Sequence, residues 1–304
     1  MAPVEMRTKK ISEGNVDFAH YTRAETAFNI IQSSSFWLRN SRLMNDYSEM
    51  ILGLRTVELN FAERSKVGGS FWQKTREIDL HFKDKVQARF DQQKEHVFSK
   101  TYIGCLSEYS NIHTGPELGK LSMWRAYGYP NGVALVFDGA SVISDNTTLD
   151  VTSYPVFYPS YGVDLPALAA GIENLTQNFK LLKDFDPQLI ANALADIMIH
   201  LAIGIKDSNF HEEAEWRVVF REGAYQHQVS SIKPAVVSGV PQLVCSVPLD
   251  DDRQLSLKRI LKKIVIGPTE YPEIAREAFV KLLEEQGFDS PALKVFTSNI
   301  PYRG

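Results

Sequence analysis

The stretch GVALVFD at 132–138 decides the fold of this chain. It is an almost continuous apolar run that opens at the turn-forming pair Asn131-Gly132, and it predicts a strand buried on both faces in the middle of a sheet. Further strand patterns lie at 16–21, 36–40, 101–108, 213–222, 242–249, 258–268 and 292–300. Helical patterns lie at 23–34, at 51–98 with a break at 67–70, and at 121–128, 164–182, 186–205 and 272–287. Because strands and helices alternate without regular βαβ spacing, we expect an α+β fold with a mixed sheet.

Length and composition are those of an ordinary globular protein. The chain has 304 residues, which at roughly 150 residues per domain corresponds to one large or two small domains. Lys and Arg total 33 against 37 for Asp and Glu, giving a net charge of −4. This charge argues against a polybasic binder that relies on bulk counterion release, but it leaves room for a local basic groove. Two cysteines provide neither a disulfide framework nor a four-thiolate zinc site.

No segment predicts export or a membrane span. Residues 1–14 lack an apolar run after their charges, and the most apolar stretch, 189–205, contains Asn192, Asp196 and His200. We therefore expect a cytoplasmic protein without membrane contact. The three polar residues recur every four positions and so share one helical face. Asp196 and His200 could form an acid–base pair or a metal half-site, or the three residues are simply the polar stripe of an apolar helix.

The motifs of several common enzyme classes are missing. The sequence contains no GxGxxG, GxxxxGK[ST], HExxH or GxSxG pattern. Dinucleotide-binding, P-loop, zinc protease and hydrolase interpretations therefore lose support. The seven histidines are scattered along the chain, and we predict no metal site.

Two aromatic blocks are candidates for ligand contact. His20-Tyr21-Thr22 ends a strand directly before a helix, where an imidazole and a phenol can donate to sugar hydroxyls or phosphate. In the block LSMWRAYGYPNG at 121–132, Trp124, Tyr127 and Tyr129 could wall a flat ligand such as nicotinamide or a base. Core packing is the alternative interpretation of both blocks.

A third block, HEEAEWRVVF at 211–220, carries two acids at the start of an apolar strand. If the strand includes both, Glu213 and Glu215 share one face of the sheet. Two close carboxylates raise one another's pKa, which suits acid–base work. Arg217 on the same face could hold Glu215 ionised instead, and an exposed acidic strand edge is the remaining interpretation.

Taken together, these blocks resemble a bacterial family known as domain of unknown function 2971. The residues that match its pattern are His20-Tyr21-Thr22, Trp37-Leu38, Met44-Asn45-Asp46 with Glu49, Cys105-Leu106-Ser107, Met123-Trp124 with Tyr127, Glu213 to Arg217, and Ser298 to Arg303. They occur in order over nearly the whole chain. YPNG at 129–132 departs from the pattern, because a more basic or histidine-containing loop is expected there.

The order of elements is also similar to that of NAD-dependent ADP-ribosyltransferases, which have a split mixed β-sheet with flanking helices. This resemblance implies a single domain over 1–304, with helical insertions near 51–98 and 164–205. It implies that Glu215, with Glu213 two positions earlier, is catalytic, and that the two acids meet His20 in one cleft. Of the residues expected to bind NAD, His20 would contact a ribose, and Ser107 and Tyr127 would contact the nicotinamide. The other expected NAD contacts are Tyr21, Thr22, Asn45, Trp124 and Arg217.

The implied chemistry fits these residue types. Cleavage of the nicotinamide–ribose bond passes through an oxocarbenium-like state, which Glu215 would stabilise while accepting a hydrogen bond from the ribose 2′-hydroxyl. The leading hypothesis is a toxin or phage-defence transferase that modifies a base of RNA or single-stranded DNA and is covered by an antitoxin protein. The alternatives are a transferase with a protein acceptor, a non-catalytic nucleotide- or nucleic-acid-binding module, and a nuclease that uses scattered acids and histidines.

Overall fold

The computed structural model of the chain contains two compact units, each assembled from segments that are distant in sequence. The first comprises residues 1–40, 102–155 and 212–304, and the second comprises residues 41–101 and 156–211. The structure describes residues 16–43, 48–109, 119–128, 130–143, 150–159, 165–224, 230–237, 239–250 and 255–300. The two helical stretches expected as insertions, 51–98 and 164–205, both lie in the second unit.

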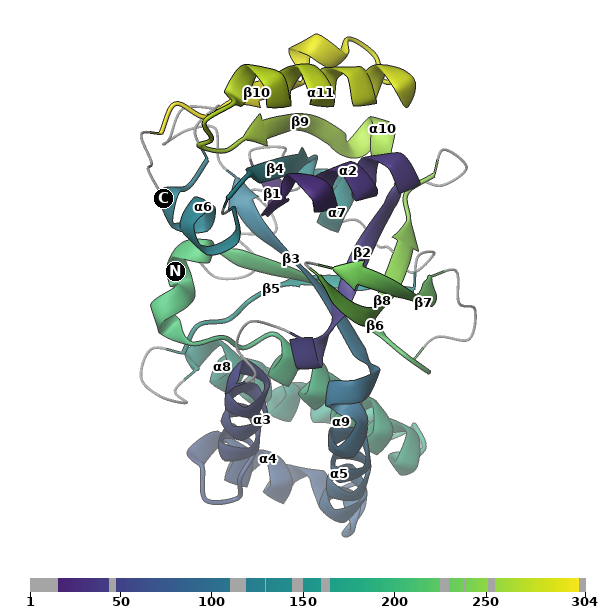
Figure 1. Cartoon of the computed structure of the whole chain (residues 1–304). Coiled ribbons are helices and arrows are strands. Elements are labelled where there is room, and N and C mark those ends of the chain that lie inside the picture. The colour runs from purple at the N-terminus through teal and green to yellow at the C-terminus, as the bar shows by residue number, and fades with distance from the viewer. Residues whose placement is uncertain are drawn as a thin grey trace. The chain divides into compact units, whose positions relative to one another are not determined.

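The first unit is built on a mixed sheet (Figure 1). Its strands are β1 (Asp17–Arg23), β2 (Ser35–Asn40), β3 (Thr101–Tyr109), β4 (Gly132–Phe137), β5 (Thr152–Pro155), β6 (Glu215–Arg221), β7 (Ser231–Val237), β8 (Val240–Pro248), β9 (Leu261–Ile266) and β10 (Val295–Thr297). The order is β10-β9-β4-β1-β3-β2-β8-β7, with β6 paired to β3 and β5 paired to β6. Because β9 is parallel to β10 and antiparallel to β4, the expected α+β class with a mixed sheet is confirmed.

Strand β3 is the branch point of this sheet. β1 pairs with its C-terminal part up to Ala19↔Ser107, whereas β2 pairs with its N-terminal part at Arg39↔Ile103. β6 pairs with β3 as well. At Gly104, between the two pairings, a Cβ atom would lie 2.5 Å from the ring of Phe36. A residue without a side chain is therefore needed where β1 and β2 diverge.

The predicted central strand is confirmed. All six residues of β4 are buried, because β1 and β9 flank it and both of its faces are covered. Val133, Leu135 and Phe137 join the larger hydrophobic cluster of the unit. Ala134 and Val136 join a second cluster on the opposite face. A run with little polar character is what a strand covered on both faces requires.

Helices cover the two faces of the sheet. They are α2 (Ala24–Ser33), α6 (Leu121–Tyr127), α7 (Gly139–Ile143), α10 (Leu257–Ile260), α11 (Pro272–Glu285) and the 3-10 turn η5 (Pro291–Leu293). α2 and α11 meet through Phe28 and Phe279, whose ring centres are 4.6 Å apart. On the other face α6 inserts Trp124, against which a Cβ at Gly267 would lie 2.8 Å away.

The second unit is helical in its described part (Figure 1). It contains η1 (Ser41–Leu43), α3 (Ser48–Asn60), α4 (Lys66–Thr75), α5 (Phe82–Lys100), α8 (Pro166–Asn178), η3 (Phe179–Leu182) and α9 (Pro187–Ile203). α9 packs along α3 and α5. Gly53 of α3 allows the closest approach, since a Cβ there would lie 1.9 Å from the carbonyl oxygen of Ala202.

Local expectations fail at four places. The break predicted at 67–70 is wrong, because α4 runs through Gly68 and Gly69 and its start is capped by Ser65, whose Oγ accepts from the Gly68 amide. A Cβ at Gly68 would lie 2.5 Å from the Ala62 carbonyl oxygen, so this glycine allows close packing rather than a turn. The sequence patterns miss β5 and β7, and the strand expected over 292–300 is limited to β10.

Candidate functional site

The two acids of the HEEAEWR block occupy different elements. Glu213 ends the 3-10 helix η4 (Ser208–Glu213), and β6 begins at Glu215. Between them Ala214 has a positive φ of 45°, in the left-handed region. The prediction that both carboxylates share one face of a single strand is therefore wrong, because the strand begins after the turn at Ala214.

Glu215 forms a buried ion pair with Arg217. The Arg217 Nε lies 2.7 Å from Glu215 Oε1, and their side chains are 0% and 2% exposed. Residues 215 and 217 alternate along β6 with Trp216, whose ring packs 5.0 Å from that of Phe18 in the larger core. Glu215 and Arg217 therefore point to the opposite face of the sheet. The interpretation that Arg217 holds Glu215 ionised fits this geometry.

Glu213 is half-buried and is held by residues from β3 and α6. The Tyr127 hydroxyl lies 3.2 and 3.3 Å from its two carboxylate oxygens and donates to them. The Ser107 hydroxyl donates to the Glu213 backbone carbonyl. The structure thus brings together Ser107, Tyr127 and Glu213, which are distant in sequence.

Lys120 completes this cluster and was not predicted. Its Nζ donates to Ser107 Oγ at 3.0 Å and to the carbonyl oxygens of Glu212 and Glu213 at 3.3 and 3.5 Å. A lysine just before a short helix carries no local signal of such a role. Only the path of the chain places its amino group beside the end of η4.

Tyr21 and Trp124 support the cluster from the core. The Tyr21 hydroxyl accepts from the Lys120 amide at 3.0 Å, and its ring meets Trp124 edge-on at 4.9 Å. The two side chains are 6% and 1% exposed, so core packing describes both better than an open wall does. Burial raises the pKa of Tyr21 above its ordinary value, which keeps this phenol protonated.

His20 lies on the other face of β1. Its Nδ1 is 2.9 Å from the Cys105 carbonyl oxygen, and its ring meets Phe36 edge-on at 4.9 Å. Burial lowers the pKa of His20 from 6.5, against the effect of the bond to Cys105. Thr22 shares this face because it is two residues further along the strand. His20 and Thr22 are thus separated by the sheet from Ser107 and Glu213, and the expected residue Asn45 lies outside the described residues.

Ala214 and Trp216 of the E-x-E-W-R block anchor it to β3. The Glu108 amide donates to the Ala214 carbonyl oxygen at 3.1 Å. The Trp216 indole Nε1 donates to the Glu108 carboxylate at 3.0 Å. These bonds fix the start of β6 beside Ser107.

Two other candidates from the sequence have structural explanations. Asp196 accepts from the Gln93 side chain, and His200 Nδ1 lies 2.8 Å from the backbone oxygen of Asp196, as expected for the polar stripe of α9. Lys262 is a candidate for the local basic groove that the net charge leaves possible, and it lies 2.7 Å from Asp17 and 3.1 Å from Asp138. These acids compensate its charge and leave it less suited to phosphate.

An apolar cavity of about 50 Å³ lies in the larger core of the first unit, lined by residues such as Phe36, Leu106 and Val218. A cavity of this size and lining stays dry and is far too small for a dinucleotide.

In the described part of the chain, no group of three or more His, Cys, Asp or Glu could hold a metal ion. None of the helices within the described ranges is long and apolar enough to span a membrane.

Comparison with known proteins bears on part of the chain. A family described as "Protein of unknown function (DUF2971)" matches residues 123–218, from α6 into β6. This match confirms, over that stretch, the family resemblance inferred from the sequence blocks. No curated protein and no solved structure matches the chain.

Proposed function

We propose that the chain is an NAD-dependent ADP-ribosyltransferase. Its active site would lie on the sheet face that carries Ser107, Tyr127, Glu213 and Glu215. The observation that supports this most is that two carboxylates close in sequence have different environments. Glu215 is buried and held by Arg217, whereas Glu213 is half-buried and held by Tyr127. The branching of the sheet at β3 agrees with the split sheet that the resemblance implies.

In the proposed reaction the bond between ribose C1′ and the nicotinamide nitrogen breaks. The bonding electrons leave with nicotinamide, which becomes neutral, and the positive charge is shared between C1′ and the ring oxygen. The Glu215 carboxylate accepts from the 2′-hydroxyl and stabilises this charge, which a dry site strengthens. A lone pair of the acceptor then bonds to C1′, and Glu213 takes up the proton that the acceptor loses.

This proposal places two demands on the molecule. Glu215 is 2% exposed, so NAD must uncover it on binding. His20 and Thr22, the proposed ribose contacts, lie on the other face of β1. NAD would have to reach them past the edge where β1 and β3 diverge. Tyr21 and Trp124 would support this edge from the core, while Asn45 stays a proposed contact on the sequence pattern alone.

The acceptor that we propose is a base of RNA or single-stranded DNA, in a cytoplasmic toxin or phage-defence system with a covering antitoxin. This part rests on the resemblance. Lys262 is compensated by acids, and so are Lys74, Lys83, Lys85, Lys94 and Lys183 of the helical unit. A protein acceptor is therefore the main alternative.

The test is transfer of label from NAD to a mixed cell extract. Glu213→Gln and Tyr127→Phe should each lower labelling, because they remove the proton acceptor and the group that holds it. Glu212→Gln, an exposed neighbouring acid, is the matched control and should label normally. Digestion of the labelled product with RNase, DNase or protease identifies the acceptor. The proposal is contradicted if the wild-type chain leaves the extract unlabelled. It is also contradicted if the double variant Glu213→Gln/Glu215→Gln labels the extract fully.

A binding module without chemistry is the second candidate, and the burial of Glu215 in its ion pair favours it. Calorimetry with NAD beside a nicotinamide-release assay separates the two. Binding together with release supports the transferase, whereas binding without release supports the module.

A further inference from the structure

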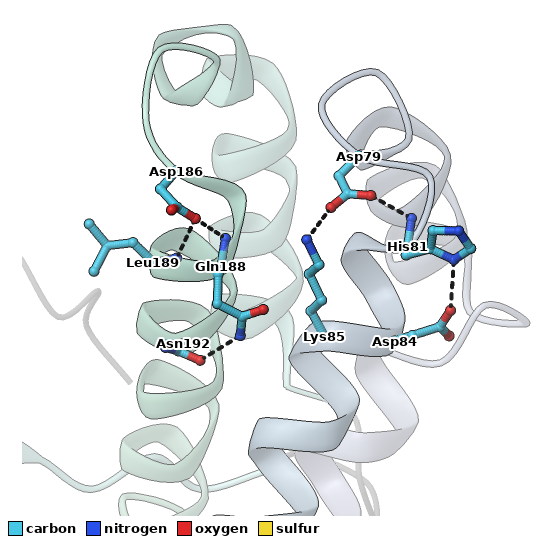
Figure 2. Close-up of polar contacts among 8 residues, drawn as sticks. All are labelled: Asp79, His81, Asp84, Lys85, Asp186, Gln188, Leu189 and Asn192. Atoms are coloured by element: carbon cyan, nitrogen blue, oxygen red, sulfur yellow. Dashed lines mark hydrogen bonds and ion pairs between the residues drawn. The ribbon is translucent and has the colours of Figure 1, made fainter.

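A polar groove of about 540 Å³ lies in the helical unit, between the first half of α5 and the start of α9. The lining residues that matter below are His81, Asp84, Lys85, Arg89, Gln188 and Asn192. Figure 2 shows Lys85 and Gln188 on the facing sides of the two helices, while Leu189 points away. The volume is within the range of small-molecule sites, roughly 300–1,000 Å³.

Most charges of the groove are already compensated. Lys85 Nζ lies 2.5 Å from Asp79 Oδ2, and Asp79 also accepts from the His81 amide at 2.8 Å. These contacts lower the pKa of Asp79, with the Lys85 bond as the largest cause. His81 Nδ1 lies 3.6 Å from Asp84 at the rim (Figure 2). Lys85 is therefore not available as a full positive charge for a ligand.

Arg89 is different, because its charge has no acidic partner among the described residues. Its Nη1 donates to the neutral amide oxygen of Gln92 at 3.0 Å. Its Nε is buried and has no hydrogen-bond partner in the described part of the chain. A buried N–H without a partner is costly, and a guanidinium presents its donors in a fork that matches a carboxylate. Arg89 thus brings to the groove one positive charge that no acid among the described residues compensates.

The opposite wall provides neutral hydrogen-bonding groups. Gln188 Nε2 donates to Asn192 Oδ1 at 3.1 Å, which orients the two amides along α9. The first backbone N–H groups of α9 are not available to a ligand, because those of Gln188 and Leu189 donate to the Asp186 carboxylate at 2.6 and 3.4 Å (Figure 2). The groove therefore combines one cation with side-chain amides.

We infer that this groove binds a small polar molecule with a single carboxylate, which pairs with Arg89 while its polar body contacts Gln188 and Asn192. Arg89 is the cation of the groove without an acidic partner among the described residues, and it matches one carboxylate. A polyphosphate or a nucleic-acid backbone would bring several negative charges to this one cation, beside the carboxylate of Asp84. The site lies within the helical unit and is independent of the proposed transferase chemistry.

Calorimetric titration of the full chain with gluconate, L-glutamate and acetate tests the inference, with tripolyphosphate as the polyanion. At least one polar carboxylate should bind saturably in the millimolar range, more tightly than acetate and tripolyphosphate. Arg89→Gln should weaken this binding roughly 10- to 100-fold, the effect of one charge-assisted bond. Arg89→Lys, which keeps the charge and loses the fork, should give an intermediate affinity.

Lys83→Gln is the matched control, because it removes the same charge from α5 at a residue that pairs with Glu63 at 3.1 Å outside the groove. Its affinity for the probe should equal that of the wild type. Thermal unfolding of each variant checks that the helical unit is intact. The inference is overturned if no carboxylate probe binds, if tripolyphosphate binds best, or if Lys83→Gln weakens binding as much as Arg89→Gln.

Discussion

The ion pair of Glu215 and Arg217 offers a quantitative test of how dry the candidate site is. Glu215→Gln removes the negative charge and so breaks the ion pair with the guanidinium of Arg217, which is 0% exposed. Breaking a buried pair in this way costs about 3–5 kcal/mol. Since domains are stable by about 5–15 kcal/mol, this variant should lose a large part of its stability or fail to fold.

Removal of the other partner of the ion pair should give a stability that depends differently on pH. Arg217→Met leaves a buried carboxylate, which can become neutral by taking up a proton, whereas the arginine left by Glu215→Gln stays charged at all accessible pH. The folded Arg217→Met chain therefore binds a proton more strongly than its unfolded state does. Its deficit relative to the wild type should shrink as pH falls from 7 towards about 5, while that of Glu215→Gln should not.

The double variant Glu215→Met/Arg217→Met removes both charges and keeps side-chain volume. Its stability should return to within about 1–2 kcal/mol of the wild type or exceed it, because no charge is left buried and unpaired. Urea unfolding followed by circular dichroism gives the free energies of unfolding of the wild type and the three variants. Glu284→Gln, which breaks an exposed pair with Lys281, should change the midpoint little.

The reasoning is refuted if Glu215→Gln costs less than about 1 kcal/mol, the range of exposed pairs. It is also refuted if both single variants show the same pH dependence. Either result would mean that water reaches the pair, and Glu215 would then be open to substrate without the uncovering step required above.

Three further outcomes are expected. Gly53→Ala should destabilise the helical unit by about 1–3 kcal/mol in urea unfolding, because its Cβ would lie 1.9 Å from the Ala202 carbonyl oxygen. Because burial lowers the pKa of His20 from 6.5, the unfolded state takes up a proton before the folded state does, and stability should fall as pH drops below 6.5. His20→Gln should flatten that part of the stability–pH curve, and an unchanged slope would contradict it. Trp216→Phe should cost about 1 kcal/mol or more in thermal unfolding, because it loses the hydrogen bond to Glu108.

Several elements follow from local sequence because their pattern and their burial have the same cause. The run at 132–138 is apolar since β4 is covered on both faces, and the amphipathic stretch at 272–287 becomes α11. The same logic fails at Gly68, where a glycine serves close packing rather than a turn. It also fails for β7, which is mostly exposed or half-buried and contains Pro234.

For the candidate site, the residue types were predictable and their geometry was not. The alternation of a strand already places His20 and Tyr21 on opposite faces, although the family pattern treats them as one block. No pattern indicates that Ala214 adopts a left-handed conformation and assigns the two acids to different elements. Nor does any pattern indicate that Lys120 reaches Ser107.

The sequence by itself determined the fold class, the positions of most strands and helices, and the block of residues from which the candidate site is built. These depend on local periodicity and on side-chain polarity, which are written along the chain. Only the tertiary structure decided that β3 is shared by β1, β2 and β6, that Tyr127 holds Glu213 across 86 residues, and that Glu215 is buried with Arg217. The physical reason is that hydrogen bonds and burial depend on which distant segments become neighbours, and that depends on the packing of the whole unit.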